Sequence, residues 1–221
     1  MIRSWATLVL MGILAVILAA GCATPGSESP AASAQMSPVP LLTPTPRATA
    51  AANPCGMRPV VAPTPAHDPG YTQLDPSTGL HVTGKIQLLE LVTYRLRVTG
   101  MVDRPLELGY DEIRCLPRVQ ARPILVCPGF FEDEATWAGA AIADVLALAG
   151  VQDGAQEVEF VSADGYSTRL PLDKALDRAN FLAYQWEGEP LPRLHGFPLR
   201  VVIPEALGDK WTKWLVEVRV R

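Results

Sequence analysis

The sequence predicts an α+β fold, on three observations. Many short stretches alternate apolar and polar residues, as half-buried strands do, whereas helical periodicity occurs in only a few places. Strands and helices do not alternate regularly along the chain, as a doubly wound parallel sheet would require. The chain has 221 residues, which is enough for one domain with a substantial core and a tail.

The first half of the folded region is expected to contain two strands and a helix. Residues 94–99 alternate strictly, which predicts a strand. Residues 110–116 are expected to make two helical turns, with Ile113 and Leu116 facing inward. Residues 123–127 form a short apolar run between prolines, which is typical of a buried strand.

The second half contains the clearest helix and most of the strands. Residues 140–149 place their apolar side chains on one helical face, and a glycine follows as a C-terminal stop. Residues 157–163 and 166–170 alternate around Asp164-Gly165, which predicts a hairpin. A brief helix is expected over residues 173–178. Three further strands are expected over residues 181–186, 199–203 and 215–220.

The first 22 residues resemble the signal sequence and lipobox of bacterial lipoproteins. Arg3 supplies a positive charge, and residues 5–20 are almost wholly apolar. This run is shorter than the roughly 20 residues that a membrane-spanning helix needs. Small residues then lead directly to Cys22, which in such lipoproteins carries the lipid. We therefore expect residues 1–21 to be a signal peptide and Cys22 to be lipidated. An uncleaved membrane anchor is the alternative, and both place the protein at the extracytoplasmic face of a bacterial membrane.

Residues 22–70 are expected to form a tether and residues 71–221 the folded domain. Between residues 23 and 69 the chain places eleven of its 21 prolines among Ala, Ser and Thr. Few large apolar side chains are present to offset the entropy lost on ordering. The proline content favours a semi-extended chain that holds the domain away from the bilayer.

The four cysteines require separate roles. With Cys22 lipidated, an oxidising compartment leaves one of the other three unpaired. Cys127 ends an apolar run and enters a Pro-Gly loop, where close approach of the backbone to a ligand would favour glycine. The hypothesis is therefore a disulfide between Cys55 and Cys115, with Cys127 free. Composition alone favours an inert core cysteine at Cys127.

Eight sequence blocks, taken in order, change the interpretation of Cys127. From His81 to the C-terminus, they resemble the molybdopterin-binding domain of the sulfite oxidase family. The resemblance covers roughly the whole folded part and implies that family's fold. The blocks are residues 81–84, 94–100, 127–129, 137–139, 164–166, 188–192, 195–200 and 208–214.

The resemblance implies a molybdenum–molybdopterin cofactor. Cys127 matches the cysteine that ligates the metal, which agrees with the preference of soft metal centres for thiolate. His195 and Arg200 match the residues that hold the pterin and its phosphate, a task that suits the planar fork of arginine. Lys213 would add a second cation, and Lys210 is a further candidate.

Three more residues receive roles from the resemblance. Tyr166 and Asp164 lie in a segment that approaches the metal in this family, where a tyrosine hydroxyl could orient an oxo group or the substrate. His81 is a candidate for the pterin pocket. Taken singly, His195 fits a turn residue and Arg200 a solvated strand residue, so the assignment depends on the blocks together. The tryptophans at 137, 211 and 214 are expected to pack in the core.

The resemblance implies a molybdopterin-dependent oxidoreductase that transfers an oxygen atom to or from a small molecule. The acidic residues 132–134 would repel sulfite, unless Arg118 or Arg122 folds over the site, and this favours a neutral substrate such as a sulfoxide. No haem attachment motif occurs in the sequence, so an external electron carrier is expected, such as a cytochrome or a quinone-linked subunit. The net charge of −4 argues against nucleic acid.

Two other classes of protein stay open at this point. The first is a non-catalytic lipoprotein that keeps the fold as a binding or structural module. Only Arg3 precedes the apolar run, whereas exported relatives usually carry a twin-arginine signal, and this difference favours that alternative. The second is a thiol-redox protein that uses Cys127 directly.

Overall fold

A computed structural model describes residues 55–64 and 67–221. The predicted signal peptide, the lipidation of Cys22 and most of the tether lie outside these residues. No helix in the described part of the chain is long and apolar enough to cross a membrane.

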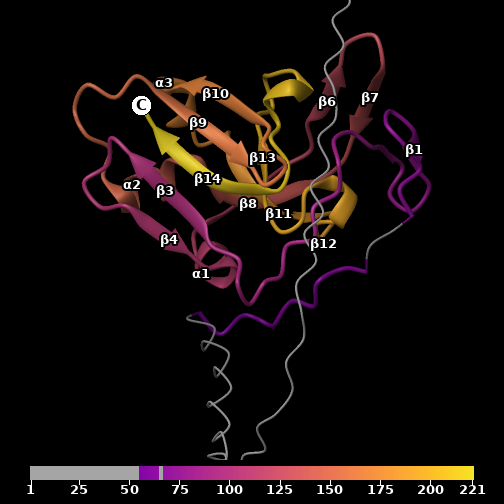
Figure 1. Ribbon diagram of the computed structural model, residues 1–221, viewed down its shortest axis with the longest axis horizontal. Coiled ribbons are helices and arrows are strands. Elements are labelled where there is room, and N and C mark those ends of the chain that lie inside the picture. Colours follow the sequence, from indigo (N-terminus) through magenta and orange to yellow (C-terminus); the bar gives the residue numbers. More distant parts are fainter. Residues whose placement is uncertain (1–54, 65–66) are drawn as a thin grey trace, which may run out of the picture. The chain divides into compact units, whose positions relative to one another are not determined.

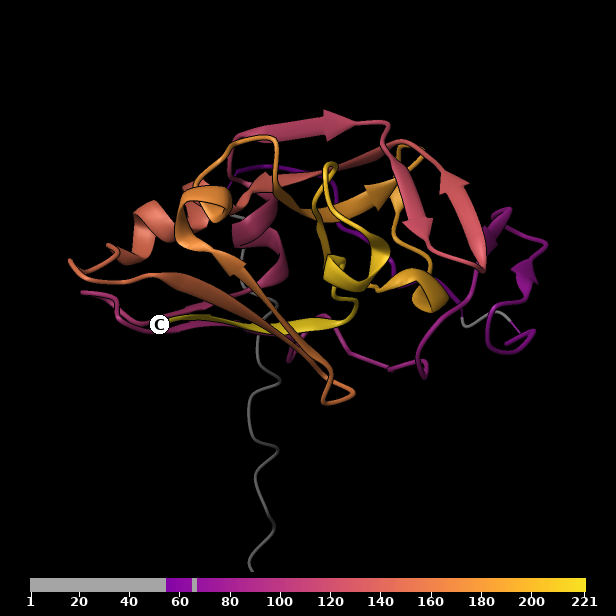
Figure 2. The same cartoon turned by 90° about the horizontal axis from the view of Figure 1, so that it is seen from above.

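Two five-stranded sheets form two layers (Figure 2). In the first sheet β14 pairs in parallel with β3 and antiparallel with β9, so the C-terminal strand lies at its centre. In β3 the apolar residues face the core and Arg97 is exposed, as the alternation in sequence requires. In β14 the charged residue Glu217 is itself buried, and it pairs with Arg97 and Arg219. The order of the first sheet is β10 (Ser167–Pro171), β9 (Glu157–Ser162), β14 (Leu215–Val220), β3 (Leu96–Gly100) and β4 (Leu106–Leu108).

The second sheet is fully antiparallel and carries residues of the site at its end. Strand β11 is its hub, because it pairs with β12, β8 and β13. Every residue of β8 is buried. The members are β12 (Glu189–Pro190), β11 (Phe181–Trp186), β8 (Trp137–Ala141), β5 (Arg118–Ala121) and, paired to β11, β13 (Arg200–Val202).

Three short helices complete the core: α1 (Tyr110–Arg114), α2 (Ile142–Ala149) and α3 (Leu172–Ala175). Helix α2 buries the apolar face that its periodicity predicts and ends at Gly150, which has a positive φ of 71°. Helix α1 buries Ile113 completely. These elements confirm the α+β class, with many short strands and few short helices.

Two hairpins lie outside the large sheets. One joins β1 (Leu74–Asp75) to β2 (Leu80–His81), and the other joins β6 (Ile124–Cys127) to β7 (Phe131–Glu134). They lie side by side (Figure 1), and the backbone N–H of His81 donates to the Asp133 carboxylate at 2.8 Å. Residues of both hairpins line the same pocket.

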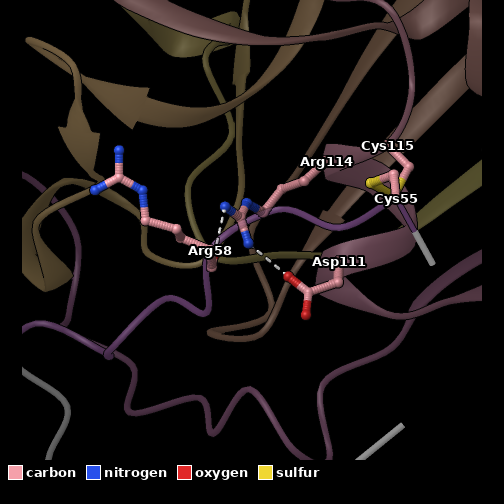
Figure 3. The surroundings of a disulfide bond; sticks show 5 residues. All are labelled: Cys55, Arg58, Asp111, Arg114 and Cys115. Carbon is pink, nitrogen blue, oxygen red and sulfur yellow. Dashed lines mark hydrogen bonds and ion pairs between the residues drawn. A yellow bond between two sulfur atoms is a disulfide. The ribbon is translucent and has the colours of Figure 1, made fainter. Parts of the chain in front are cut away.

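The disulfide between Cys55 and Cys115 is present, as predicted, and Cys127 is free. It fastens residues 55–64 to helix α1 (Figure 3), where Arg114 donates to the carbonyl of Arg58 at 3.1 Å and pairs with Asp111. The sequence assigns residues 55–64 to the tether, but two of their apolar side chains pack against the core.

Four predicted elements differ from the structure. The helix expected over 110–116 ends at Arg114, so Leu116 lies beyond it. The helix expected from residue 140 begins at Ile142, because residues 137–141 form β8. The helix expected over 173–178 spans only Leu172–Ala175. The run at 123–127 forms the hairpin strand β6, in which Leu125 alone is fully buried. Gly129 in its turn has a φ of +79°, and a Cβ added there would meet no atom within 4 Å. The turn conformation, and not crowding, therefore requires glycine at this position.

Candidate functional site

A pocket of about 450 Å³ opens between the two hairpins and the C-terminal loops. Its volume lies within the range of small-molecule and cofactor sites. The side chains that the sequence points to meet here from separate segments of the chain, with the exception of Lys210. The pocket is lined by His81, Cys127, Asp164, Tyr166, His195, Arg200 and Lys213, among others.

Arg200, the first residue of β13, is a buried cation that forms no salt bridge with a described residue, although the charge of Asp133 acts on it from a distance. Its guanidinium lies over the rings of Trp137 and Trp211, with its central carbon 4.6 and 5.5 Å from the ring centroids. One terminal nitrogen of its guanidinium donates to the carbonyl of His195 at 3.2 Å. Its Nε has no hydrogen-bond partner among the residues that the structure describes. Burial lowers the pKa of Arg200 to about 9, which leaves it charged at neutral pH.

Lys213 is the second buried cation. Its Nζ lies 4.5 Å from the centroid of the Trp214 ring and donates to the carbonyls of Thr83 and Leu194. Burial, and then repulsion by Arg200, lower the pKa of Lys213 to about 7. Within the described residues, no carboxylate forms a salt bridge with Lys213 or Arg200. Aromatic rings, backbone carbonyls and carboxylates beyond salt-bridge distance compensate these two cations only in part, so burying them is costly unless an anion binds beside them.

Gly196 lets these two cations approach each other. It has a φ of +112°, which favours glycine. A Cβ at this position would lie 3.0 Å from the Cβ of Arg200 and 3.2 Å from that of Lys213. The backbone turn that carries His195 is therefore packed directly against the bases of both cationic side chains.

Cys127 lies at the end of β6 with its thiol partly buried. Burial, and then the negative charges of Asp209 and Asp133, raise the pKa of this thiol. A protonated thiol is a weak nucleophile, so the geometry disfavours direct thiol redox chemistry at neutral pH.

The acidic loop contributes one carboxylate to the pocket, not three. Strand β7 alternates, so Asp133 is buried whereas Glu132 and Glu134 are exposed. Asp133 accepts a hydrogen bond from His81 Nδ1 at 2.7 Å, and the His81 ring stacks on Phe131 with centroids 4.4 Å apart. The repulsion expected from residues 132–134 therefore comes from Asp133 alone, and His81 bonds to it.

His195 is buried at the base of the pocket, in the short 3₁₀ turn Arg193–His195. Burial, and then repulsion by Lys213, lower the pKa of His195 to about 4, although its hydrogen bond to Asp75 opposes this shift. Asp75 lies 3.0 Å from His195 Nε2, and the sequence did not reveal this contact. Asp75-Pro-Ser-Thr is a typical turn sequence. Nothing in it indicates a histidine 120 residues away.

The remaining candidates differ in position. Tyr166 lines the mouth of the pocket, and its hydroxyl donates to the carbonyl of Asp209 at 2.8 Å. Asp164 also lines the pocket and accepts a hydrogen bond from the backbone N–H of Tyr166. Lys210 lies outside the pocket, with its ammonium at the surface 3.5 Å from the carboxylate of Asp209.

The fold and the pocket define a cofactor-binding domain with a site for an anion and a free thiol. Residues 83–221 match the family described as oxidoreductase molybdopterin binding domain, and the chain belongs to this family. The two unpaired cations fit the phosphate of such a cofactor, and the thiol fits its soft metal.

Relatives of known name support this assignment. The chain is 36% identical over 135 residues to an uncharacterized oxidoreductase, YuiH, of Bacillus subtilis, and the match covers 60% of this chain and 68% of the relative. It is 36% identical over 159 residues to human mitochondrial sulfite oxidase, covering 58% of this chain and 29% of the relative. The chain thus spans less than a third of that enzyme.

A solved structure gives the same fold. The sulfane dehydrogenase SoxCD from Paracoccus pantotrophus superimposes with a TM-score of 0.58 at 26% identity, over 63% of this chain and 41% of that chain.

Proposed function

We propose that the pocket binds molybdopterin with its molybdenum, and that Cys127 supplies the thiolate ligand of the metal. The observation that carries the proposal is the pair of buried cations, Arg200 and Lys213, which line the pocket and form no salt bridge with any described residue. The phosphate of the cofactor would supply the missing anion.

The proposed reaction is two-electron oxygen-atom transfer on a small molecule. The bound cofactor would supply the redox chemistry. The residues of this chain would hold the cofactor and orient the substrate. Arg200 and Lys213 would bind the phosphate of the cofactor. Tyr166 and Asp164, which also line the pocket, would contact the substrate as it enters. The Tyr166 hydroxyl has its hydrogen engaged by Asp209, so its oxygen is free to accept a hydrogen bond from a substrate or from water.

The charges around Cys127 favour a neutral substrate over sulfite. Burial raises the pKa of Cys127 most, and the charges of Asp209 and Asp133 raise it further; these two carboxylates would also repel an anion near the thiol. The two arginines in and after strand β5 do not compensate, since Arg118 bonds to Gln185 and Arg122 pairs with Glu134. A sulfoxide or another neutral oxygen-atom donor or acceptor fits this field.

The proposal includes a location and a partner. We propose that a lipid on Cys22 holds the protein at the extracytoplasmic face of a bacterial membrane. An external electron carrier, such as a cytochrome or a quinone-linked subunit, would exchange electrons with the site. The support for the location is the lipobox-like sequence before Cys22.

Metal and pterin analysis tests the proposal. Protein made in a host that produces molybdopterin is expected to contain about one molybdenum and one pterin per chain. Cys127→Ser is expected to lose the metal but keep most of the pterin, because Arg200 and Lys213 remain. Exposed Phe130→Leu, in the same turn, is the matched control and should keep both. Folded wild-type protein without metal or pterin would contradict the proposal and favour a non-catalytic module.

A further inference from the structure

The β1–β2 hairpin lies before residue 83, outside the part of the chain that matches the family. It nevertheless reaches the base of the pocket. Its residue Asp75 is only 1% exposed, and among the described residues it is the one carboxylate that contacts His195. The hairpin thus brings a buried negative charge to a histidine that the family-matched segment supplies.

The two oxygens of the Asp75 carboxylate have different partners. Oδ1 accepts hydrogen bonds from the backbone N–H and the hydroxyl of Ser77, at 2.9 and 2.7 Å. Oδ2 lies 3.0 Å from both the Thr78 hydroxyl and His195 Nε2. Burial opposes ionisation of Asp75, but these hydrogen bonds outweigh it and keep its pKa below the usual value. The carboxylate is therefore charged and can only accept.

Hydrogen counting assigns the tautomer of His195. The Thr78 oxygen lies 2.9 Å from His195 Nε2 and accepts the N–H of Leu80. Thr78 has one hydroxyl hydrogen, which it can donate either to the Asp75 carboxylate or to Nε2. In both cases, an Nε2 without a hydrogen would face the carboxylate as one acceptor against another. Nε2 must therefore carry the hydrogen. In a neutral imidazole Nδ1 is then a bare acceptor, and no described residue donates to it.

We propose that Asp75 is a positioning residue that fixes His195 in its Nε2-protonated tautomer, so that Nδ1 of the neutral ring is available to an N–H donor of the pterin ring. The phosphate is then held by Arg200 and Lys213 without help from His195. This inference rests on the proposed function for its ligand, but the tautomer itself is a property of the protein without cofactor. The hairpin outside the matched segment is, on this account, part of the cofactor site.

The tautomer can be measured in cofactor-free protein with ¹⁵N-labelled histidine by long-range ¹H–¹⁵N correlation NMR. The chain has three histidines, and His81 serves as an internal reference because it bonds to Asp133 through Nδ1 instead. Wild-type His195 is expected to be the Nε2-protonated tautomer at pH 7. A wild-type His195 protonated at Nδ1 would overturn the proposal without any variant being needed.

Three variants separate orientation by Asp75 from general packing. Asp75→Asn keeps the turn but replaces the obligate acceptor, and should give a mixture of both tautomers of His195. Thr78→Val keeps the carboxylate and should leave the Nε2-protonated form unchanged. Asp177→Asn alters an equivalent exposed turn and is the matched control, because none of the contacts described for His195 involves it. The role of Asp75 would be overturned if His195 in Asp75→Asn stayed wholly in the Nε2-protonated tautomer. It would also be overturned if Thr78→Val no longer held His195 in that tautomer.

Pterin release from loaded protein tests the ligand. With one oriented hydrogen bond weakened, Asp75→Asn should release fluorescent pterin about tenfold faster than wild type, with Asp177→Asn unchanged. Equal release rates, with the tautomer lost, would refute the contact between Nδ1 and the pterin. If wild-type protein never binds pterin, both the proposed function and the contact between His195 Nδ1 and the pterin are refuted. The tautomer measurement still decides the role of Asp75.

Discussion

At the scale of single residues, the site trades stability for binding. Arg200 and Lys213 are buried without salt-bridging carboxylates in the described part of the chain, so the protein without its ligand bears the cost of desolvating two charges. Both are partly compensated by aromatic rings and backbone carbonyls. An anion that binds beside them, such as the phosphate of the cofactor, recovers this cost, so the part of the pocket at these two cations prefers an anionic group to a neutral one.

Lys213 and Lys210 offer a matched pair of variants three residues apart. Lys213→Met removes a buried cation from the pocket, and should reduce pterin retention at least about tenfold while leaving the cofactor-free protein as stable as wild type or more so. Lys210→Met removes an exposed cation outside the pocket and should change neither. Pterin content after dialysis and urea unfolding are the measurements. Equal loss in both variants would contradict the assignment of Lys213.

At the scale of elements, the sequence pattern predicts four of the five strands of the first sheet, all except β4, because their two faces differ. Strands β3, β9, β10 and β14 each place apolar residues on one face and charged residues on the other, although Glu159 and Glu217 are buried in ion pairs with arginines. Strand β8 was missed for the opposite reason: all five of its residues are buried and most are small, so the pattern does not alternate. The hairpin strand β7 was missed because three of its four residues are acidic.

The sequence predicts those residues of the site that lie in the eight blocks resembling the molybdopterin-binding domain. Cys127, His195, Arg200 and Lys213 were singled out in this way, and the fold brings all four to one pocket. Asp75 was not, because its contact with His195 exists only after the β1–β2 hairpin docks on a distant turn. Nor does the sequence show that Glu132 and Glu134 point away from the pocket, since that depends on the register of the hairpin.

The strap, defined as residues 55–64, is attached to helix α1 by the disulfide. The bond joins residues 60 apart, so chain entropy alone predicts about 4 kcal/mol of stabilisation of the folded domain. Replacing both Cys55 and Cys115 by Ala should lower the free energy of unfolding by up to this amount in urea titrations. Wild-type protein kept reduced is the comparison and should match the double variant. No loss of stability in either would show that the unfolded chain is not restrained by the bond.

At the scale of the whole molecule, the folded unit extends beyond the segment that matches the family. The strap and the β1–β2 hairpin both precede residue 83 and both contact that segment. Arg114 and Arg193 donate to carbonyls of the strap, at Arg58 and Pro63. These contacts place the N-terminal part of the described chain in the same cooperative unit as the pocket.

The stability of the cofactor-free protein should increase with pH just above neutrality. The pKa of Lys213 is about 7 in the folded state and 10.5 without burial, so between these values the unfolded state binds one more proton. The free energy of unfolding should therefore rise from about pH 7 to about pH 8.5, by about 1–2 kcal/mol. Urea unfolding of oxidised protein at both pH values measures it, and Lys213→Met should flatten the change. A decrease in wild type would contradict the burial of an unpaired lysine.

The position of the disulfide also determines how mechanical load enters the domain. A pull on the chain from the N-terminal side reaches the described part first at Cys55, and the covalent bond passes it directly to Cys115 at the end of α1. The segment between the two cysteines, which contains the strap, Asp75 and the β1–β2 hairpin, then lies off the line of force. Tension on the N-terminal side can thus be borne while the wall of the pocket stays unloaded, and reduction of the bond would reroute that tension through the hairpin.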